Sequence, residues 1–319
     1  MTATQVNGLM QADKPSSFPQ TVPALADEKI KVVFIAGCGR SGTTLLAQLL
    51  GEFDNFVNVG EAALYLFKPP KTLPCGCGSA AVDCLFWKDI LQAIPKGLSD
   101  QGAKSLRVQN FPALFREAKQ HHIPTELKPI LAALGDTYRT IVRESGCKII
   151  VDSSKHPSTG LLASMIPGVE LHVVHVVRSP HSVVASWTRK NGYLAVHPPG
   201  KVVSWWWTHN LLAEALKFRA KSYQRVRYED FARNPGPVLE QITTDVVGQP
   251  LPMDFLQGTE ATVHMQHVLA GNPSKFNTGK IKIRDANSSA AGSRKLLTNL
   301  LTFPLQYRYR YLLPPQDNS

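Results

Sequence analysis

A glycine loop near the start of the chain has the residue types and spacing for binding phosphate. Gly37 and Gly42 form a GxxxxG pattern between the apolar run at residues 31–36 and a helix-like run that starts at Thr43. Successive backbone N–H groups in such a loop, with the N-terminus of the following helix, form a concavity that favours phosphate. Thr43 takes the place of the Lys found in nucleoside-triphosphate hydrolases, which argues against an ATPase or a kinase. Arg40 is placed to supply the positive charge instead.

A second cationic position follows another apolar run. Arg178 stands directly after residues 171–177, and Ser186 lies eight positions later in an expected helix. Ser179 is a good N-cap for that helix, and Pro180 is a good first helical residue. An Arg fork and a Ser hydroxyl are both suitable donors to phosphate. The sequence therefore predicts two anion sites in one chain.

The overall charge agrees with an anionic ligand. The chain has 319 residues, with 35 Lys and Arg against 24 Asp and Glu, and a formal net charge of +11. Such an excess favours nucleic acid, a membrane surface or a small polyanion as partner. Runs of like charge are short, which argues against a nucleic-acid-binding tail and favours a localised site. With 43% hydrophobic residues the composition is globular, which excludes disorder and collagen-like repeats.

The elements that would position these groups alternate between short apolar runs and helical patterns. This alternation predicts an α/β fold with a central parallel sheet flanked by helices in three layers. In such sheets, ligands bind beyond the carboxyl ends of the strands. The expected strands cover residues 31–36, 147–152, 171–177 and 224–228, and the expected helices cover residues 43–50, 181–190 and 202–220. The apolar stripe of the last helix is expected to consist of Trp207, Leu211, Ala215 and Phe218.

The composition along the chain predicts a single domain. Residues 1–29 are polar with three prolines and are expected to form a flexible leader. Residues 30–319 are expected to form one domain, with a Cys-containing insert at residues 68–90. The chain has no stretch of about 18 uncharged apolar residues, and its start lacks the pattern of a secretory signal. We therefore expect a cytoplasmic protein with no membrane partner.

The run from Gly39 to Leu46 resembles the 5′-phosphosulfate loop of sulfotransferases that use 3′-phosphoadenylyl sulfate (PAPS). Three further segments follow in the family's order. Arg178 to Ser186 is similar to the 3′-phosphate element, Val226 to Asp230 to the segment whose Tyr lies against adenine, and Gly271 to Phe276 to the loop that closes over the 3′-phosphate. The resemblance covers residues 31–285. It implies that PAPS is bound by Gly39, Arg40, Ser41, Gly42, Thr43, Thr44, Arg178, Ser186, Tyr228, Asn272, Lys275, Phe276 and Gly279.

The resemblance also implies a P-loop-like fold and a transfer of the sulfuryl group without a metal, with adenosine 3′,5′-bisphosphate as product. The chain is most similar to the bacterial small-molecule branch, although its loop and its Gly60-Glu61 pair resemble tyrosylprotein sulfotransferases. Two positions depart from the family pattern. Lys275 stands where many members have Arg, which keeps the charge but removes the fork. Leu45 replaces the aromatic residue that cytosolic sulfotransferases place beside adenine.

Sulfuryl transfer needs a base for the acceptor's proton and a cation for the leaving oxygen. Glu61 is the favoured base because it lies 21 residues beyond Arg40, like the catalytic Glu of the branch that it resembles. In that branch the Lys of a Lys-x-Pro segment contacts the bridging oxygen, which gives this role to Lys155 together with Arg40. His156 would orient the acceptor or act as the base in place of Glu61, and His267 is a third candidate base. The expected acceptor-binding residues are Glu61, Tyr65, His156 and His267.

The cysteines lead to two further expectations. Cys75, Cys77 and Cys84 would bind zinc if a fourth ligand joined them, but their spacing lacks the second pair of a zinc motif. Free thiols are therefore the favoured interpretation, with a metal site or a labile disulfide as alternatives, and no metal is predicted. Cys38 lies inside the glycine loop, where a helix N-terminus and a nearby Arg lower a thiol pKa. It is expected to be reactive.

We expect the acceptor to be a hydroxyl or nitrogen of a small molecule, such as a secondary metabolite, and not a nucleic acid. Two other functions stay open. A P-loop nucleotide kinase with a degenerate loop would need ATP and Mg²⁺, and the missing loop Lys argues against it. A non-catalytic basic protein that binds nucleotides or nucleic acid would show steeply salt-dependent binding, but would leave the four ordered segments unexplained. The sequence leaves the oligomeric state open.

Overall fold

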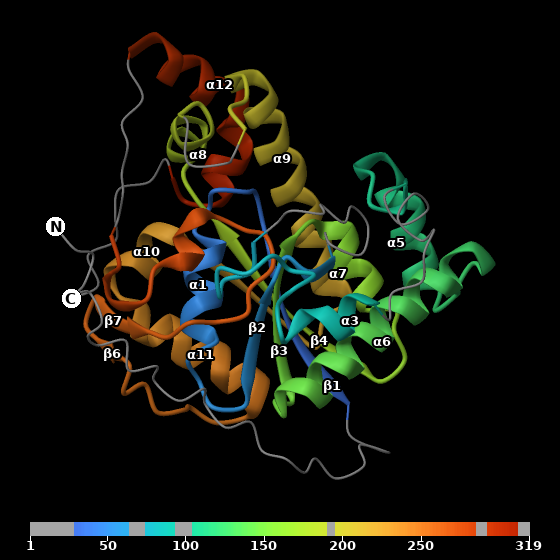
Figure 1. Cartoon of the computed structure of the whole chain (residues 1–319). Helices are drawn as coiled ribbons and strands as arrows, with labels where there is room; N and C mark the ends of the chain where they lie inside the picture. Colours follow the sequence, from blue (N-terminus) through green and yellow to red (C-terminus); the bar gives the residue numbers. More distant parts are fainter. Residues whose placement is uncertain (1–28, 64–73, 93–103, 190–194, 285–291, 312–319) are drawn as a thin grey trace, which may run out of the picture.

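The computed structural model describes residues 29–63, 74–92, 104–189, 195–284 and 292–311. At its centre is a five-stranded sheet in the order β2-β3-β1-β4-β5, and every neighbouring pair of strands is parallel (Figure 1). This arrangement confirms the predicted α/β fold. The strands are β1 (Ile30–Ala36), β2 (Phe56–Gly60), β3 (Ile149–Lys155), β4 (Val169–Val177) and β5 (Ser222–Arg227).

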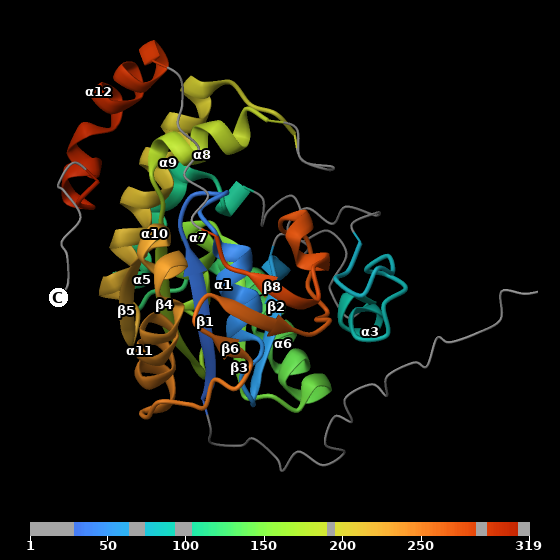
Figure 2. The ribbon, with the colours of Figure 1, turned by 90° about the vertical axis from the view of Figure 1, so that its left-hand side faces the viewer.

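Helices cover both faces of the sheet because its central strands are apolar on both sides (Figure 2). In β1, Val32 and Phe34 face one helical layer, Val33 and Ile35 face the other, and all four are buried. The first layer consists of α6 (Lys128–Ser145), α7 (Pro157–Ala163) and α9 (Pro199–Ala215), with α3 (Trp87–Gln92) and α5 (Phe111–Lys119) packed outside. The second layer consists of α1 (Thr43–Leu50), α10 (Tyr228–Arg233) and α11 (Pro235–Val247).

Two more helices lie beyond the carboxyl ends of the strands. These are α8 (Pro180–Trp187) and α12 (Gly292–Arg308), which pack beside α9 at the top of Figure 1. A separate small core joins this region, and it includes Val177, Trp206 and Tyr309. It supports the same end of the sheet at which the glycine loop lies.

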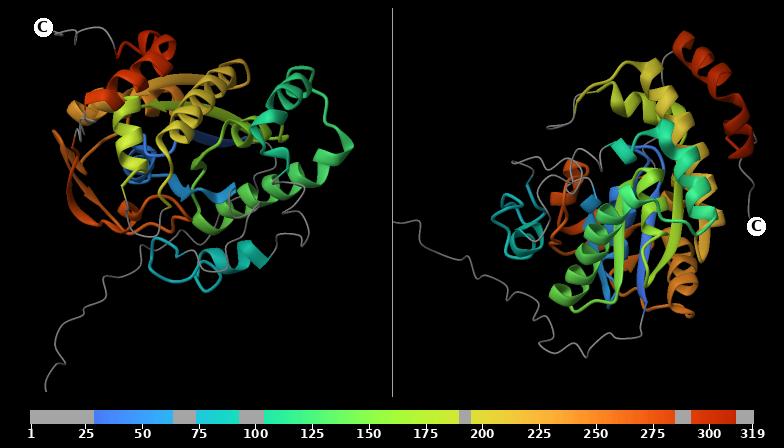
Figure 3. Two further views of the ribbon diagram at one scale, coloured as in Figure 1. Left: turned by 90° about the horizontal axis from the view of Figure 1, so that it is seen from above. Right: turned by 90° about the vertical axis from the view of Figure 1, so that its right-hand side faces the viewer.

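A small antiparallel sheet lies beside α1, where Figure 3 shows it in orange. Its strands are β6 (Leu256–Gln257), β7 (Glu260–Val263) and β8 (Gly279–Lys282), in that order. Ala261 and Val263 pack into the core on the α1 side of the main sheet. This sheet was not predicted, because its strands are short and their apolar and polar residues alternate only weakly.

Four strands of the main sheet are confirmed to within a few residues. The differences from the prediction lie in the two edge strands of this sheet, β2 and β5. The strand β2 was not predicted, because it has five residues and a polar Asn58 in its middle. Asn58 is nevertheless buried, and its side-chain amide donates to Gln266 Oε1 at 2.7 Å. The predicted strand at residues 224–228 ends one residue earlier, since Tyr228 is the first residue of α10.

The predicted apolar stripe of α9 is wrong. Leu211 and Phe218 are 50% and 68% exposed. The buried stripe runs through Trp206, Asn210 and Ala213 instead. This stripe was not predicted because the polar Asn210 interrupts the apolar pattern. In the fold its side-chain oxygen lies 3.0 Å from His175 Nε2 on β4, which satisfies both buried groups.

Within the expected insert, residues 74–86 form a hairpin closed by a bridge between Pro74 and Ala80. We call this segment the Cys hairpin. The expected leader lies outside the described residues apart from Lys29. In the described ranges, no helix is both long and apolar enough to cross a membrane.

Candidate active site

Each of the five parallel strands brings a predicted group to the same edge of the sheet. The glycine loop follows β1, Glu61 follows β2, Lys155 ends β3, Arg178 follows β4 and Tyr228 follows β5. These groups border one cavity of about 600 Å³, a size typical of small-molecule sites. The predicted residues that line this cavity are Gly39, Arg40, Gly42, Thr43, Thr44, Glu61, Lys155, Arg178, Ser186, Tyr228 and Asn272.

The glycine loop needs its glycines for steric reasons. Gly42 has φ of 90°, a left-handed conformation that side chains other than glycine rarely adopt. A Cβ atom there would also lie 2.1 Å from the ring of Tyr228. Arg40 has φ of 71° and so also takes a left-handed conformation, which is a strain more often found at functional sites. The loop is therefore held in one shape by packing as well as by local sequence.

The start of α1 presents donors to the cavity. Thr43 and Thr44 line it, and the N-cap position is Gly42, whose lack of a side chain leaves the first N–H groups of the helix uncapped. Ser41 is fully buried under the loop, and its hydroxyl has no hydrogen-bond partner within the described part of the chain. Helix N-termini of this kind favour anions.

Arg178 connects the two expected anion sites. One of its guanidinium nitrogens donates to the Arg40 carbonyl at 3.2 Å, and its guanidinium carbon lies 4.4 Å from the centre of the Tyr228 ring. On the other side, the buried indole of Trp206 donates to the Arg178 carbonyl at 2.9 Å. Ser186 lines the cavity from α8. The side chain that was expected to contact adenine, Tyr228, thus also positions Arg178.

The predicted cap of α8 takes a different form. Ser179 occupies the N-cap position, but its side chain makes no capping hydrogen bond. Its backbone N–H instead donates to Glu229 Oε1 at 2.9 Å. Glu229 is buried on α10 and also accepts from the Tyr311 hydroxyl at 2.8 Å. A long-range carboxylate therefore fixes the segment that follows Arg178.

Glu61 and Lys155 form an ion pair at the centre of the site. Lys155 Nζ contacts Glu61 Oε1, and the two side chains are only 15% and 17% exposed respectively. Lys155 has φ of 65°, which turns the chain out of β3 toward the cavity. The sequence predicted both residues, but not that they touch. Their contact depends on the unpredicted strand β2, which places Glu61 beside the end of β3.

A buried network supports this ion pair from below. Asp152 accepts from the Tyr138 hydroxyl at 2.7 Å and from the Ser154 backbone N–H at 2.8 Å. Ser154 Oγ in turn accepts from the Ala63 N–H, two residues after Glu61. Burial raises the pKa of Asp152, while these hydrogen bonds oppose the shift. The network therefore links the two strand ends that carry Glu61 and Lys155.

Several residues that line the cavity were not predicted, among them Trp187, Lys282 and Arg284. Trp187 follows Ser186 directly; its indole donates to the Gly39 carbonyl at 3.1 Å, and the Arg40 guanidinium lies 5.1 Å from its ring centre. Lys282 and Arg284 reach the cavity from the small sheet, so no local motif marks them. The described lining residues include five cations and one carboxylate, Glu61, and this excess of positive charge favours an anionic ligand.

Several predicted residues do not line the cavity. His156 is the N-cap residue of α7, and its ring packs edge-to-face on His209 at 5.3 Å between ring centres. Phe276 is 39% exposed, and Gly279 begins β8. Ser41 lies beneath the loop, as described above. Tyr65 lies outside the described residues.

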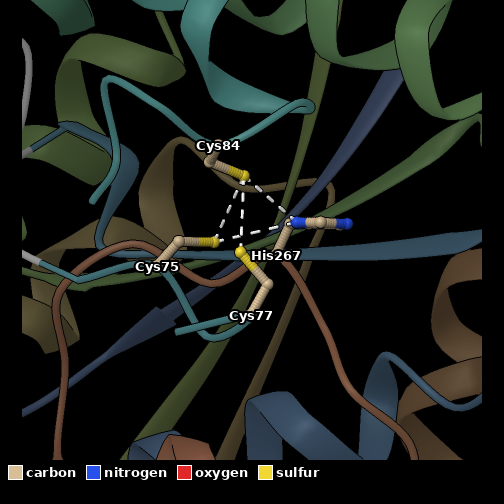
Figure 4. Close-up of side chains that lie close together, drawn as sticks. All are labelled: Cys75, Cys77, Cys84 and His267. Carbon is tan, nitrogen blue, oxygen red and sulfur yellow. Dashed lines mark hydrogen bonds between the residues drawn. The ribbon is translucent and has the colours of Figure 1, made fainter. Parts of the chain in front are cut away.

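Lys275 and His267 face the Cys hairpin instead. Lys275 is 3% exposed, burial lowers its pKa to about 8, and its ammonium donates to the Pro74 carbonyl at 2.6 Å. The His267 ring points toward Cys75 and Cys84 (Figure 4). Its expected part in acceptor binding stays a prediction that this position does not support.

The expectation of a reactive Cys38 is wrong. The side chain is 1% exposed, and burial raises the pKa of its thiol to about 12, although the charge of Lys155 opposes the shift. Desolvation of the thiolate therefore outweighs the nearby helix N-terminus. The thiol is neutral at physiological pH.

Comparison with known proteins agrees with the site. The structure matches the sulfotransferase domain of the olefin synthase from Synechococcus PCC 7002, with a TM-score of 0.51 and 19% identity over 92% of this chain and 99% of that one. It also matches the sulfotransferase STF9 from Mycobacterium avium, with a TM-score of 0.44 and 11% identity over 91% of this chain and 78% of that one. No curated protein matches the sequence. A model of the sulfotransferase family matches residues 32–246, about two thirds of the sequence. The chain therefore belongs to the sulfotransferase family.

Proposed function

We propose that this protein transfers the sulfuryl group of PAPS to a hydroxyl or nitrogen of a small-molecule acceptor. The observation that carries the proposal is the arrangement of charge in the cavity. The glycine loop with Arg40 and the pair Arg178 and Ser186 supply two sets of donors to one cavity, with Lys155 and Glu61 beside them. A ligand with two anionic groups on one nucleoside fits two such sets of donors.

The chain has the features that a phosphosulfate end requires. Thr43 and Thr44 line the cavity, and the uncapped start of α1 offers backbone N–H groups. A Cβ atom at Gly42 would lie 2.1 Å from the Tyr228 ring, so the loop packs directly against that ring. These are the properties of a preformed anion site.

The 3′-phosphate is assigned to the second set of donors. Arg178 supplies a fork that suits a phosphate, and Ser186 supplies a hydroxyl. The ring of Tyr228 and the Arg40 carbonyl hold the Arg178 side chain in place, so little side-chain entropy is lost on binding. Arg178 is therefore the residue on which discrimination between nucleotides with and without a 3′-phosphate should depend.

The chemistry is assigned to the ion pair and to Arg40. When bound, PAPS supplies an electrophilic sulfur and a bisphosphate leaving group. Lys155 and Arg40 place positive charge where negative charge develops on the leaving oxygen. Glu61 holds a carboxylate that accepts the acceptor's proton. The contact between Glu61 and Lys155 orients both side chains before any ligand binds.

The size of the site supports a small acceptor. A cavity of about 600 Å³ is in the range of sites for drug-sized molecules. We propose a secondary metabolite as the class of acceptor and no requirement for nucleic acid or a divalent metal in the reaction. As the proposed base, Glu61 would have the reacting group of the acceptor beside its ion pair with Lys155.

Calorimetric titration tests the donor assignment. Adenosine 3′,5′-bisphosphate should bind roughly 10- to 100-fold more tightly than AMP without any divalent metal, because one more phosphate is bound by charge-assisted hydrogen bonds. Equal binding of the two nucleotides would overturn the assignment. Tight binding of ATP that requires Mg²⁺ would favour a kinase instead.

Transfer to an acceptor is then measured directly. Sulfur-labelled PAPS and a panel of phenols, alcohols and amines should yield labelled product with the wild-type protein. The expected product of the donor is adenosine 3′,5′-bisphosphate in equal amount. A bisphosphate that accumulates at the same rate with and without every acceptor would show hydrolysis instead of transfer.

A further inference from the structure

Three cysteines and one histidine from distant parts of the chain meet beside the Cys hairpin. Cys75, Cys77 and Cys84 come from the hairpin, and His267 comes from the segment that precedes Gly271, more than 180 residues later (Figure 4). Their three sulfur atoms and the His267 nitrogen all lie within 4.8 Å of one another. His267 is the fourth ligand that the sequence alone did not reveal.

Four of the six separations between the ligand atoms are close to those of a tetrahedral metal centre, and all six are within 4.8 Å. Cys84 Sγ lies 3.7 Å from Cys77 Sγ and 3.6 Å from Cys75 Sγ. His267 Nδ1 lies 3.2 Å from Cys84 Sγ and 3.8 Å from Cys75 Sγ. Zinc bonds of about 2.3 Å to sulfur and about 2.0 Å to nitrogen give tetrahedral edges of about 3.8 Å between two sulfurs and about 3.6 Å between sulfur and nitrogen.

The surroundings hold these ligands in place. Cys75 and Cys84 are buried, and Gly76 is needed between the first two cysteines because a Cβ there would lie 2.2 Å from the Gln266 carbonyl. The Phe86 ring stacks on the His267 ring, with 5.5 Å between centres. The Trp87 indole donates to the His267 carbonyl at 2.7 Å. Such outer contacts orient metal ligands.

We propose that Cys75, Cys77, Cys84 and His267 bind one structural Zn²⁺. Three thiolates and one imidazole fill the four positions that zinc prefers, and no position is left for a substrate or water. The ion is therefore separate from the sulfuryl-transfer chemistry proposed above. Binding releases the thiol protons, and the resulting cluster is negatively charged, next to the buried ammonium of Lys275.

The site would join the Cys hairpin to one wall of the cavity. The Gly76 N–H donates to the Val268 carbonyl at 3.0 Å, and the Glu61 N–H donates to the Leu269 carbonyl at 2.9 Å. Lys275 reaches back to the carbonyl of Pro74. The metal would therefore fix the segment that continues into Gly271 and Asn272, which contact the cavity.

A disulfide explains the cluster less well. Each sulfur pair is far longer than a disulfide bond of about 2.05 Å, and a bond between any two cysteines would leave the third unpaired. A disulfide would also give His267 no role. A bound metal cation explains why all four ligand atoms converge on one point.

Metal content tests the proposal. The protein purified without chelator, or refolded with added Zn²⁺, should contain one equivalent of zinc by elemental mass spectrometry. Cys84→Ser and Cys77→Ser should lose most of it, whereas Cys147→Ser should keep it, since Cys147 is outside the cluster and forms hydrogen bonds with Ser145. Replacement by Co²⁺ should give thiolate-to-metal absorption in the wild type and in Cys147→Ser but not in Cys84→Ser.

Variants of His267 keep the test independent of folding. His267→Gln should weaken zinc binding, and His267→Cys should restore one equivalent, because a thiolate reaches nearly as far as Nδ1. Chelation of the wild-type protein should lower its melting temperature by about 5–10 °C, and added Zn²⁺ should restore it.

Three results would overturn the assignment. The first is wild-type protein that takes up no zinc under reducing conditions. The second is full zinc content in Cys84→Ser together with unchanged cobalt spectra. The third is iron in place of zinc in the purified protein. None of these measurements depends on transfer of a sulfuryl group, so the zinc proposal can fail while the proposed function stands.

Discussion

Two walls of the same cavity are built in opposite ways. One, which we call the loop wall, consists of residues 37–44, so its donors are consecutive in sequence. The other, which we call the C-terminal wall, consists of residues 266–277, and it is held by contacts to residues more than 180 positions away. The difference shows that the donors of the loop wall are encoded locally, whereas the position of the C-terminal wall needs connections across the fold.

The C-terminal wall is attached to the loop wall by side-chain amides. The side chain of Gln48 on α1 donates to the Ser274 carbonyl at 3.4 Å, and Gln266 donates to the Gln48 carbonyl at 3.0 Å. The Asn272 N–H lies 3.5 Å from Thr44 Oγ1. These long or single hydrogen bonds are weak individually. The proposed zinc ion would therefore be the strongest connection of that wall.

The largest effect is expected from the ion pair that lies between the two walls. Glu61→Gln should lower the turnover number by about 10²- to 10⁴-fold, because it removes the base and keeps the shape of the side chain. The affinity for adenosine 3′,5′-bisphosphate should change less than about threefold. His156→Ala is the control, since that ring packs on His209 and does not line the cavity. A larger loss in turnover with His156→Ala would assign the base to the histidine.

The rigidity of the loop wall can be measured with a pair of glycines. Gly248→Ala should lower the free energy of unfolding by about 1–2 kcal/mol, because its φ of 93° is left-handed but a Cβ there meets no atom within 4 Å. Gly42→Ala should lower the free energy of unfolding by about 1–3 kcal/mol more than Gly248→Ala does, because its Cβ would overlap the Tyr228 ring. Urea denaturation measures both values. Equal losses of unfolding free energy in the two variants would mean that the Tyr228 ring moves aside without strain.

The second anion site gives the next effect. Arg178→Ala should weaken binding of adenosine 3′,5′-bisphosphate by roughly 10- to 100-fold and leave AMP almost unaffected. Arg143→Ala removes the same charge from an exposed position beside Glu144 and serves as the control for net charge. Calorimetry measures the affinity of each of the two variants for each of the two nucleotides. An equal loss for both nucleotides would place Arg178 outside the 3′-phosphate site.

The smallest effect is expected from the C-terminal wall. If zinc orders this wall, its removal should weaken binding of adenosine 3′,5′-bisphosphate by about threefold to tenfold, because the wall must then be ordered by the ligand. The titration compares metal-depleted and reconstituted protein, at a temperature where both are folded. Cys147→Ser should behave as the wild type. Identical affinities would show that hydrogen bonds alone hold the wall.

The two walls also differ in how far they could be predicted. The strand, loop and helix at residues 31–50 are confirmed, because buried β-branched runs and glycines act over a few residues. In contrast, β2 and the stripe of α9 escaped prediction, because buried Asn58 and Asn210 have their partners elsewhere in the fold. Hydrogen bonds to distant groups make a polar residue suitable for a core position, and no local pattern shows them.

The candidate site divides in the same way. Arg40 and Arg178 could be named from the sequence because each follows an apolar run, and parallel strands collect their ends at one edge. Lys155 was named from the family resemblance of its Lys-x-Pro segment. The contact between Lys155 and Glu61 was not visible, since it depends on the pairing of β2 with β3. The roles of Trp187 and Arg284 depend on packing of α8 and of the small sheet.

The sequence by itself determined the class of fold, the glycine loop and the cations at the strand ends, because these follow from local sterics and from the alternation of strands and helices. Only the tertiary structure decided that His267 joins the three cysteines and does not line the cavity. It also decided that Cys38 is buried, which raises the pKa of its thiol to about 12. The physical reason is the same in both cases. Ligand geometry and desolvation depend on which distant segments come together, and a one-dimensional pattern does not contain that information.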